Sequence, residues 1–357
     1  MTLTQLRAFV AVARLGSVKA AALSLRVSEP AVSGAVAALR RELGDQLFVR
    51  AAGGIALTPG GRRLAAGAAE IVGLAEETRR RVREAATQTS FLRVAATEPS
   101  AELIVPPLLE AFVRRQPEVD PSTLAVPAEV LTELLLDRRA DVAIGPAPAP
   151  ADTPAPADTP APADTAAPAA GPDPAGRPDL AADAVEHIPF LRFRLVVVAS
   201  PRHAGAGLDR AGDGPLRLPV SRLPREHWLL GPGQLDPDTP GGAFLARHGV
   251  GDGCASFFPS TAAALNAVAA GDGISLALLH LVRDELRRGA LTVLEIPGTP
   301  VDGVLRVSAL RGDRRSPTAS ALCRFVTTPA ALRSLLSRTT GVPGAHFHPT
   351  VHVSLWS

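Results

Sequence analysis

The sequence predicts a mainly α-helical N-terminal winged helix-turn-helix, then a long linker helix, then a two-lobed α/β domain. Three observations lead to this prediction. The first 90 residues contain helical hydrophobic periods separated by short turns, strand and helix patterns alternate from Phe91 onward, and a proline- and alanine-rich stretch interrupts that alternation. A chain of 357 residues is long enough for two or three such domains.

The first three predicted helices form the helix-turn-helix. The apolar residues of the first helix recur at helical spacing, as Leu3, Leu6, Val10 and Ala13. A glycine and a serine separate it from a short alanine-rich helix over about residues 18–25. Ser28 caps a third helix, in which Pro30 occupies the first turn and which ends at Gly44. This order is typical of a helix-turn-helix.

A small wing and a long helix follow. The apolar segments Leu47–Arg50 and Ile55–Leu57 flank a glycine-containing turn, which predicts a two-stranded wing. Thr58 is then placed to cap a helix with Pro59 at its first position. This helix is expected to run to about Thr87.

The long helix carries a seam of apolar and small residues at heptad spacing: Leu64, Ala68, Ile71, Ala75, Thr78 and Val82. A lone helix cannot bury such a seam, so the sequence predicts pairing with the same helix of a second subunit. The residues expected to make that contact are Leu64, Ile71, Ala75 and Val82. The alternative interpretation is an amphipathic helix that lies on its own domain.

From Phe91 the pattern changes to alternating strands and helices. Strands are expected at residues 91–96, 123–126 and 142–145, and helices at 100–115 and 129–139. This βαβαβ order predicts a parallel sheet. A second group follows, with strands at 192–199, 228–230, 256–258, 274–279, 291–296 and 304–310 and helices at 241–248, 260–270, 280–288 and 318–338.

Two segments are expected to lie outside the folded domains. Residues 146–178 hold 11 of the 34 prolines and no Val, Ile, Leu or Phe, and the run Pro-Ala-Pro-Ala-Asp-Thr occurs three times between Pro148 and Thr165. We expect a disordered insert there, either as a tolerated loop expansion or as a recognition segment. Residues 339–357 contain Gly and Pro and are expected to form a loose tail.

The charge distribution is uneven. Residues 1–90 hold 13 basic and 7 acidic side chains, whereas the remaining residues hold 24 basic and 28 acidic ones. A basic N-terminal block suits a polyanion such as DNA. The run Arg79–Arg81 is equally compatible with a solvated helix face.

Other classes of function find no support in the sequence. No apolar run approaches the roughly 20 residues of a membrane span, and the N-terminus lacks a signal peptide, so a cytoplasmic protein without a membrane partner is expected. Cys254 and Cys323 are too few for a disulfide scaffold and are expected to be small buried residues. The tail histidines His346, His348 and His352 are not interpreted as a metal site. No nucleophile or nucleotide-loop motif occurs, so neither an enzyme nor a cofactor is expected.

The third helix is expected to be the recognition helix, because the first turns of such a helix face the base edges in the major groove. The residues that this placement assigns to the DNA-facing surface are Ser28, Glu29, Pro30, Ser33 and Gly34. Phosphate contacts are expected from the wing and from the start of the next helix, through Arg50, Thr58, Arg62 and Arg63. Double-stranded DNA is therefore the predicted partner.

These residues resemble the winged helix-turn-helix of LysR-type transcriptional regulators. The matching segments, in order, are Leu3–Phe9, Ser17–Ala21, Val27–Ser33, Leu39–Gly44, Leu47–Arg50 and Leu57–Gly61. A weaker resemblance to the effector-binding domain of the family continues through Val94–Thr97, Pro106–Leu109, Leu135–Ile144 and Val268–Ile274. That domain is similar to periplasmic binding proteins, with two α/β lobes around a ligand cleft, so the resemblance implies a small-molecule effector.

The sequence departs from the family at three positions. Glu29 stands where members usually have Gln, Gly34 where they have Arg or a long polar residue, and Pro99 where they often have a small hydroxyl residue. Base preference is therefore not transferred from the family, and a preference for an anionic ligand is not implied.

The resemblance implies a division of the chain. The expected parts are a DNA-binding domain over 1–60, a linker and dimerisation helix over 61–90 and an effector domain over 91–338, with one lobe at 91–145 and 297–338 and the other at 188–296. A homodimer or homotetramer is expected.

The effector is expected at the carboxyl ends of strands, in the crevice between the lobes. The residues that follow the predicted strands there are Thr97, Glu98, Ser100, Ala128, Glu129, Ser200 and Arg202. Ser100 is also expected to cap the helix after the first strand. Hydroxyls facing Arg202 suit a small carboxylate, whereas the glutamates suit a zwitterion or a polar neutral molecule equally well.

The sequence thus predicts a sequence-specific DNA-binding transcriptional regulator that responds to a small-molecule effector. Two alternatives remain open at this point. One is a DNA-binding regulator without an effector, and the other is a ligand-binding or enzymatic module fused to a DNA anchor.

Overall fold

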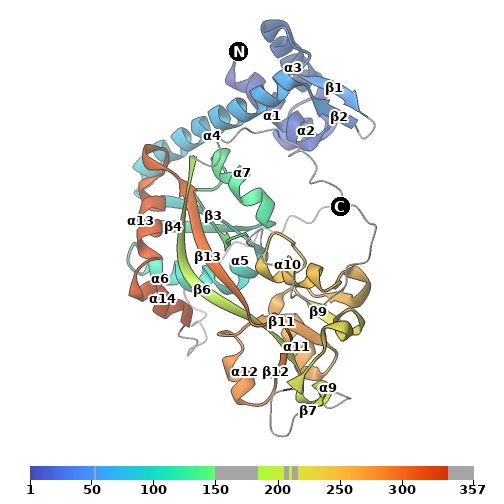
Figure 1. The fold of residues 1–357 in the computed structure, drawn as a ribbon. Helices are drawn as coiled ribbons and strands as arrows, with labels where there is room; N and C mark the ends of the chain where they lie inside the picture. The colour runs from blue at the N-terminus through green and yellow to red at the C-terminus, as the bar shows by residue number, and fades with distance from the viewer. Residues whose placement is uncertain (52–53, 149–183, 205–208, 211–215, 337–357) are drawn as a thin grey trace. The chain divides into compact units, whose positions relative to one another are not determined.

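The computed structural model describes residues 1–51, 54–148, 184–204, 209–210 and 216–336 (Figure 1). The chain divides into two compact units, the first built mainly on Met1–Gln88 and the second on the chain from Thr89 onward. Most of the predicted insert (149–178), the predicted tail with its three histidines and the wing tip at 52–53 lie outside the described residues. Within the part that the structure describes, no helix has the length and apolar character needed to cross a membrane.

Three short helices form the core of the first unit: α1 (Leu3–Leu15), α2 (Val18–Leu25) and α3 (Glu29–Leu43). Each begins at a hydroxyl residue whose side chain accepts a backbone N–H of the first turn, namely Thr2, Ser17 and Ser28. Gly16 and Gly44 end α1 and α3 in the left-handed conformation. The apolar faces meet around buried residues that include Leu6, Phe9, Val12, Val32, Val36 and Leu39. The predicted helix-turn-helix is confirmed.

The wing and the long helix also form where the sequence predicts them. Strand β1 (Phe48–Ala51) pairs antiparallel with β2 (Gly54–Leu57), and α4 (Pro59–Thr87) follows. Gly61 lies so close to the wing that a Cβ atom there would be 2.1 Å from the carbonyl oxygen of Leu47. Glycine is therefore needed for the first turn of α4 to pack against the start of the wing.

The second unit begins with three parallel strands. They are β3 (Ser90–Ala96), β4 (Val119–Ala125) and β5 (Val142–Pro146), and β3 pairs parallel with both others. The predicted parallel arrangement is therefore confirmed. Strand β4 starts earlier than expected, because the sequence pattern indicated a strand only from Thr123.

The helices between these strands differ from the prediction. In place of one helix over 100–115, the chain forms α5 (Glu98–Leu103) and α6 (Val105–Val113), since Pro106 and Pro107 lack the N–H groups that a continuous helix would need. In place of one helix over 129–139, it forms the short 3-10 turn η1 (Ala128–Val130) and α7 (Leu131–Leu136).

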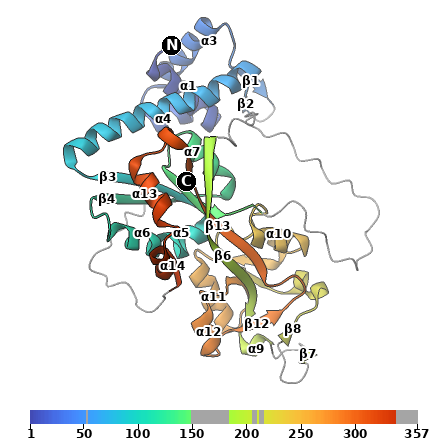
Figure 2. The ribbon, with the colours of Figure 1, turned by 60° about the vertical axis from the view of Figure 1, so that its left-hand side comes forward.

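Two long strands run through the middle of the second unit. Strands β6 (Val185–Ala199) and β13 (Val301–Leu310) are neighbours in the sheet, and Figures 1 and 2 show them side by side. Phe193 of β6 belongs to one hydrophobic cluster and Val197 of the same strand belongs to another. The two strands therefore join two lobes, each with its own core.

The second lobe is built on β6 and its neighbours. Its helices are α9 (Pro201–Ala204), η2 (Val220–Arg225), α10 (Pro240–Arg247), η3 (Asp252–Cys254), α11 (Thr261–Ala270) and α12 (Arg283–Arg287). Its other strands are β7 (Asp209–Arg210), β8 (Leu216–Arg217), β9 (Trp228–Leu230), β10 (Ala255–Phe257), β11 (Ile274–Leu278) and β12 (Thr292–Glu295). The sheet of the whole unit follows the order β10-β9-β11-β6-β13-β5-β3-β4, and β12, β8 and β7 extend from β6.

The last described helices return to the first lobe. The sequence predicted one helix over 318–338, but the structure has α13 (Pro317–Phe325) and α14 (Pro329–Leu336). Pro329 cannot continue a preceding helix, so it starts a new one. A η4 turn (Gly312–Arg314) links β13 to α13, and buried residues of α13 and α14 complete the cluster around β3 and β5.

The wing depends on one carboxylate. The N–H of Leu47 and the hydroxyl of Thr58 donate to Asp45 Oδ1 over 2.6 and 2.7 Å, and they hold the pKa of the Asp45 carboxyl below its usual value. The folded protein thus binds this proton less tightly than the unfolded chain does. The contribution of Asp45 to stability is therefore present above the unfolded pKa and is lost as the pH falls through the folded pKa.

We predict that Asp45→Asn removes part of the acid dependence of wing stability. Amide hydrogen exchange of residues 48–57 in the full chain, corrected for intrinsic rates, measures it between about pH 3 and pH 6. In wild type, the protection of these amides should fall as the pH is lowered toward 3. In the variant, their protection at pH 6 should be lower and should change less with pH. Glu29→Gln, at an exposed position of α3, is the control. An equal pH dependence in wild type and Asp45→Asn would contradict the assignment.

Candidate functional site

Helix α3 presents a continuous exposed face. Val32, Val36 and Leu39 point into the core of the first unit, and the opposite side is exposed at Glu29, Pro30, Ala31, Ser33, Gly34, Ala37 and Arg41. The hydroxyl of Ser28 accepts the N–H of Ala31 over 3.4 Å, so it caps α3. A short exposed helix face bearing a hydroxyl and backbone close to the surface has the dimensions of a major-groove reader.

Gly34 lies in open space on this face. No atom lies within 4 Å of the position that a Cβ atom would occupy there. The fold therefore does not require glycine at this position, and its effect is to leave the middle of the helix face flat.

The residues at the base of the wing have structural partners. The Thr58 hydroxyl accepts the N–H of Gly61 over 2.8 Å in addition to donating to Asp45, and Arg62 Nη1 donates to the carbonyl oxygen of Leu57 over 2.9 Å. Both groups thus hold the junction between the wing and α4, and their contact with phosphate stays a prediction. Arg63 is exposed, and Arg50 lies in β1.

Helix α4 has an exposed apolar stripe that differs from the predicted seam. Ile71, Leu74 and Val82 are 47%, 48% and 68% exposed. Leu64 instead packs against the core of the first unit, where Ala68 is fully buried, and Ala75 is half-buried. The heptad pattern leaves out Leu74, because an α-helix has about 3.6 residues per turn and drifts from a seam with period 3.5. Contact of Leu64, Ile71, Ala75 and Val82 with a second subunit stays a prediction.

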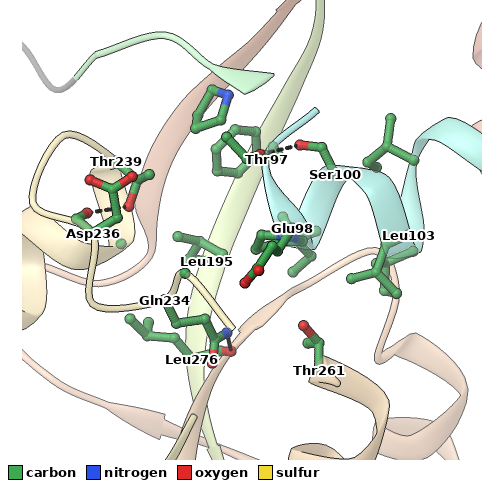
Figure 3. Close-up of a pocket in the computed structure, with 18 of the residues that line it drawn as sticks. Thr97, Glu98, Ser100, Leu103, Leu195, Gln234, Asp236, Thr239, Thr261 and Leu276 are labelled. Carbon is green, nitrogen blue, oxygen red and sulfur yellow. Dashed lines mark hydrogen bonds between the residues drawn. The ribbon is translucent and has the colours of Figure 1, made fainter. Parts of the chain in front are cut away.

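The second unit contains a cavity of about 440 Å³ between its two lobes (Figure 3). Thr97, Glu98, Leu103 and Ala128 of the first lobe line it, and the second lobe contributes residues that include Gln234, Thr239, Thr261 and Leu276. Strands β6 and β11 supply aliphatic walls through Leu195 and Leu278 among others. Its size and mixed lining are those of a small-molecule site.

The structure brings together only some of the predicted effector residues. Thr97, Glu98, Ser100 and Ala128 line the cavity, but Glu129, Ser200 and Arg202 do not. Strand β6 runs antiparallel to β11, and Leu195, not Ala199, lies at the cavity. The carboxyl end of β6 is therefore directed away from the cleft, and the expected pairing of hydroxyls with Arg202 does not occur.

Thr97 and Ser100 form a buried pair. Thr97 Oγ1 donates to Ser100 Oγ over 2.9 Å, and the side chains are 5% and 3% exposed. Thr97, and not Ser100, is the residue that precedes the first turn of α5, and its side chain makes no capping bond. The predicted capping role of Ser100 is therefore wrong, because Pro99 fits the first turn and lets the helix begin one turn earlier.

Sequence reasoning missed the loop after β9. Gln234 lines the cavity, and its amide is fixed by the N–H of Gly231 at 2.7 Å and the carbonyl oxygen of Leu276 at 3.0 Å. Strand β9 is parallel to β11, so its carboxyl end opens toward the cleft. The rule that ligands meet the carboxyl ends of strands points to this loop as well, once β9 is recognised as a central strand.

Two carboxylates join the lobes. Glu102 of α5 accepts the N–H groups of Thr261 and Ala262 over 2.8 and 3.1 Å, at the N-terminus of α11. Asp236 Oδ2 accepts the N–H of Ala128 over 3.4 Å. A carboxylate at a helix N-terminus is favoured by the unsatisfied N–H groups and by the helix dipole. The closed arrangement of the lobes is therefore held by charged hydrogen bonds across the cleft.

The cysteines are not part of this site. Both thiols are free; Cys254 is half-buried and Cys323 is buried. Burial raises the pKa of the Cys323 thiol, which opposes formation of a reactive thiolate. The interpretation of Cys323 as a small buried residue is confirmed. No group of three or more His, Cys, Asp or Glu side chains suited to a metal ion is found in the described ranges.

Comparison with protein families matches both units. Residues 3–62 match the model described as bacterial regulatory helix-turn-helix protein, lysR family. Residues 86–161 and 175–330 match the model described as LysR substrate binding domain. The second match includes the strands and helices that form the cavity.

Individual relatives match over nine tenths or more of their length. The chain is 35% identical to an uncharacterised HTH-type transcriptional regulator of Mycobacterium tuberculosis, over 100% of both chains. It is 30% identical to the HTH-type transcriptional regulator CfxR of Cupriavidus necator, over 91% of this chain and 90% of the relative.

Solved structures share the fold. The LysR family transcriptional regulator CbnR has a TM-score of 0.52 at 21% identity, covering 94% of this chain and 99% of that one. Full-length OxyR from Pseudomonas aeruginosa has a TM-score of 0.53 at 20% identity, covering 91% and 94%. Because the family models match most of the chain and the Mycobacterium tuberculosis relative extends over all of it, this protein belongs to the LysR family of bacterial transcriptional regulators.

Proposed function

We propose that this regulator binds a specific duplex sequence as a homo-oligomer, and that a small molecule in the cavity of the second unit changes that binding. The observation that carries the proposal is the exposed face of α3, on a basic domain with a wing. The proposed parts are 1–60 for DNA, 61–90 for subunit pairing and 91–338 for the effector. We assign no catalytic role to the chain and place its action in the cytoplasm, where bacterial DNA lies.

Few side chains on the exposed face of α3 are able to contact the edges of the bases. Ser33 is the exposed hydroxyl in its second turn and can donate to or accept from a base edge. Glu29 at the first position can accept from cytosine but is repelled by phosphate. Affinity then comes mainly from arginines, through phosphate contacts that are insensitive to sequence.

We predict that Ser33→Ala and Arg50→Ala weaken DNA binding in different ways. Ser33→Ala should lower discrimination between the target and random DNA by about 1 kcal/mol. Arg50→Ala should weaken both alike and reduce the slope of log affinity against log salt by about 1. Fluorescence anisotropy with the protein's own upstream region and a scrambled duplex measures both effects.

Arg225→Ala is the matched control, because Arg225 is an exposed arginine of the second unit. It should leave affinity and salt slope unchanged. If Arg50→Ala binds both duplexes as tightly as wild type does, the wing is not part of the DNA interface.

The apolar stripe on α4 supports pairing of subunits. An exposed set of large aliphatic side chains on a helix of 29 residues is costly in water and is buried when two such helices pair. Leu74 belongs with Ile71 and Val82 in this proposed contact. A pair of subunits also supplies two recognition helices for two half-sites.

We predict that Ile71→Glu dissociates the oligomer, because the contact would bury an unpaired charge. Analytical ultracentrifugation should show a smaller species, and affinity for the full DNA site should fall sharply as one half-site is lost. Thr87→Glu adds the same charge on the opposite face of α4. It should leave the oligomer size and the affinity for the full DNA site unchanged. An oligomer of wild-type size for Ile71→Glu would show that the stripe is not the contact.

The cavity supports control by a ligand through lobe closure. A molecule that contacts both lobes stabilises the closed state by the difference in its affinity for the closed and open forms. Glu102 and Asp236 bias the same equilibrium without a ligand, since each contact exists only when the lobes are together. The match to a substrate binding domain supports this use of the cleft.

We predict that Glu102→Gln loosens the closed cleft without unfolding the lobes. The amide has no charge and only one acceptor oxygen for two N–H groups, so the amides of Thr261 and Ala262 should exchange faster with solvent. The melting temperature of the second unit should fall by about 1–4 °C. Hydrogen exchange by mass spectrometry and calorimetry measure these changes.

Glu118→Gln, at an exposed position before β4, is the control and should change neither quantity. Wild-type exchange of residues 261–262 in Glu102→Gln would mean that Glu102 does not hold the lobes.

A further inference from the structure

The charges around the cavity all have one sign. The acidic side chains Glu98, Asp236 and Glu285 line it, and no Lys, Arg or His is found among the described residues that do so. Arg202, the cation expected to meet a ligand, does not line the cavity. Because like charges repel more strongly where water is scarce, an anionic ligand would be disfavoured here.

The three carboxylates differ in what already neutralises them. Asp236 accepts backbone N–H groups of Ala128 and Asp238, and Glu285 Oε1 lies 3.4 Å from Arg288. Glu98 has no hydrogen-bond or ion-pair partner among the residues that the structure describes. Glu98, together with Glu285 Oε2, which is buried without a hydrogen-bond partner among the described residues, can therefore take a cation or a donor from a ligand.

Figure 3 shows the Glu98 carboxylate directed toward the middle of the cavity, between Gln234 and Thr261. Its Oε2 lies 3.8 Å from the position that a Cβ atom on Gly233 would occupy. The loop after β9 thus approaches this carboxylate closely without supplying a side-chain partner.

A second, independent group is also unsatisfied. Thr261 lines the cavity and is 5% exposed, yet its Oγ1 has no hydrogen-bond partner within the described part of the chain. A buried hydroxyl without a partner loses the hydrogen bond that it would make in water, so a ligand that supplies a partner is favoured. Gly231 lies so close that a Cβ atom there would be 2.8 Å from this hydroxyl, and Figure 3 shows the hydroxyl on the side of Thr261 that faces Glu98.

The remaining walls are hydrocarbon. Leu195 and Leu276 belong to strands at the floor of the cavity, and Leu103, Leu278 and Leu305 add further aliphatic surface. An apolar ligand body packed against these walls is stabilised, because both surfaces are removed from water.

We propose that the ligand of this cavity is a cation with an apolar body, such as a protonated aliphatic amine. Its nitrogen donates to the carboxylate of Glu98 and to Thr261 Oγ1, and its hydrocarbon part packs against the leucines. This inference rests on the proposed function of the cleft and adds the chemical class of its effector.

The test uses three probes with the same six-carbon body: n-hexylamine, hexan-1-ol and hexanoic acid. Isothermal titration calorimetry with the full-length protein at neutral pH, where the amine is protonated and the acid ionised, gives each affinity. Hexylamine should bind at least about tenfold more tightly than hexanol, and hexanoate more weakly than both. Hexanoate binding as tightly as hexylamine would overturn the proposal.

Variants locate the charge effect. Glu98→Gln keeps the size of the side chain and should lower hexylamine affinity about tenfold while leaving hexanol affinity within about a factor of two. Glu129→Gln removes a nearby carboxylate that does not line the cavity, so the affinities for hexylamine and hexanol should both stay at the wild-type value. An unchanged preference for the amine in Glu98→Gln overturns the role of Glu98.

A further variant separates this inference from the proposed function. Ala269 is exposed and lines the cavity, so Ala269→Trp adds bulk there without replacing a core residue. If hexanol or hexanoate binds wild type best and Ala269→Trp abolishes that binding, the cleft is a ligand site and only the cationic class is wrong. If wild type binds DNA but none of the probes, the effector function of the cleft fails together with the inference.

Discussion

The cleft depends on the pair of long strands that pass through both lobes. Strands β6 and β13 keep one sheet continuous while each lobe has a separate core, so any change in lobe closure must bend or twist this pair. Gly303 of β13 makes the close packing possible, because a Cβ atom there would lie 2.2 Å from the ring of Phe193 on β6. Phe193 in turn lines the cavity. The strands that join the lobes are therefore also part of the ligand site.

Two carboxylates at the cleft have opposite effects on its closure: Glu102 favours the closed lobes and Glu98 does not. Glu102 gains from the N-terminus of α11, whereas Glu98 lies at the cavity with no partner among the residues that the structure describes. A cation would add an attraction to Glu98 that the protein alone lacks, and it would leave the Glu102 contact in place. A cationic ligand can thus stabilise the closed lobes further, without competing with the hydrogen bonds that already hold the lobes together.

The DNA-binding unit, unlike the cleft, is held together by contacts between residues that are close in the sequence. Its fold is held by local signals: serine and threonine caps, glycine ends, and the hydrogen bond from Thr58, the cap of α4, to Asp45 in the segment before the wing. Little of the recognition face is committed to internal bonds, and Gly34 leaves its centre open. The unit therefore presents a recognition face that its own packing does not constrain.

The sequence by itself determined the first unit closely, because helix caps, turns and hydrophobic periods act within a few residues of one another; α2 and α4 end where the patterns predict. It also determined the parallel order of β3, β4 and β5. Only the tertiary structure decided which strand ends meet at the cleft, since the antiparallel direction of β6 takes Ser200 and Arg202 away from it and brings in Gln234 and Thr261. Strand direction and partner choice depend on contacts between distant segments, which local patterns do not encode.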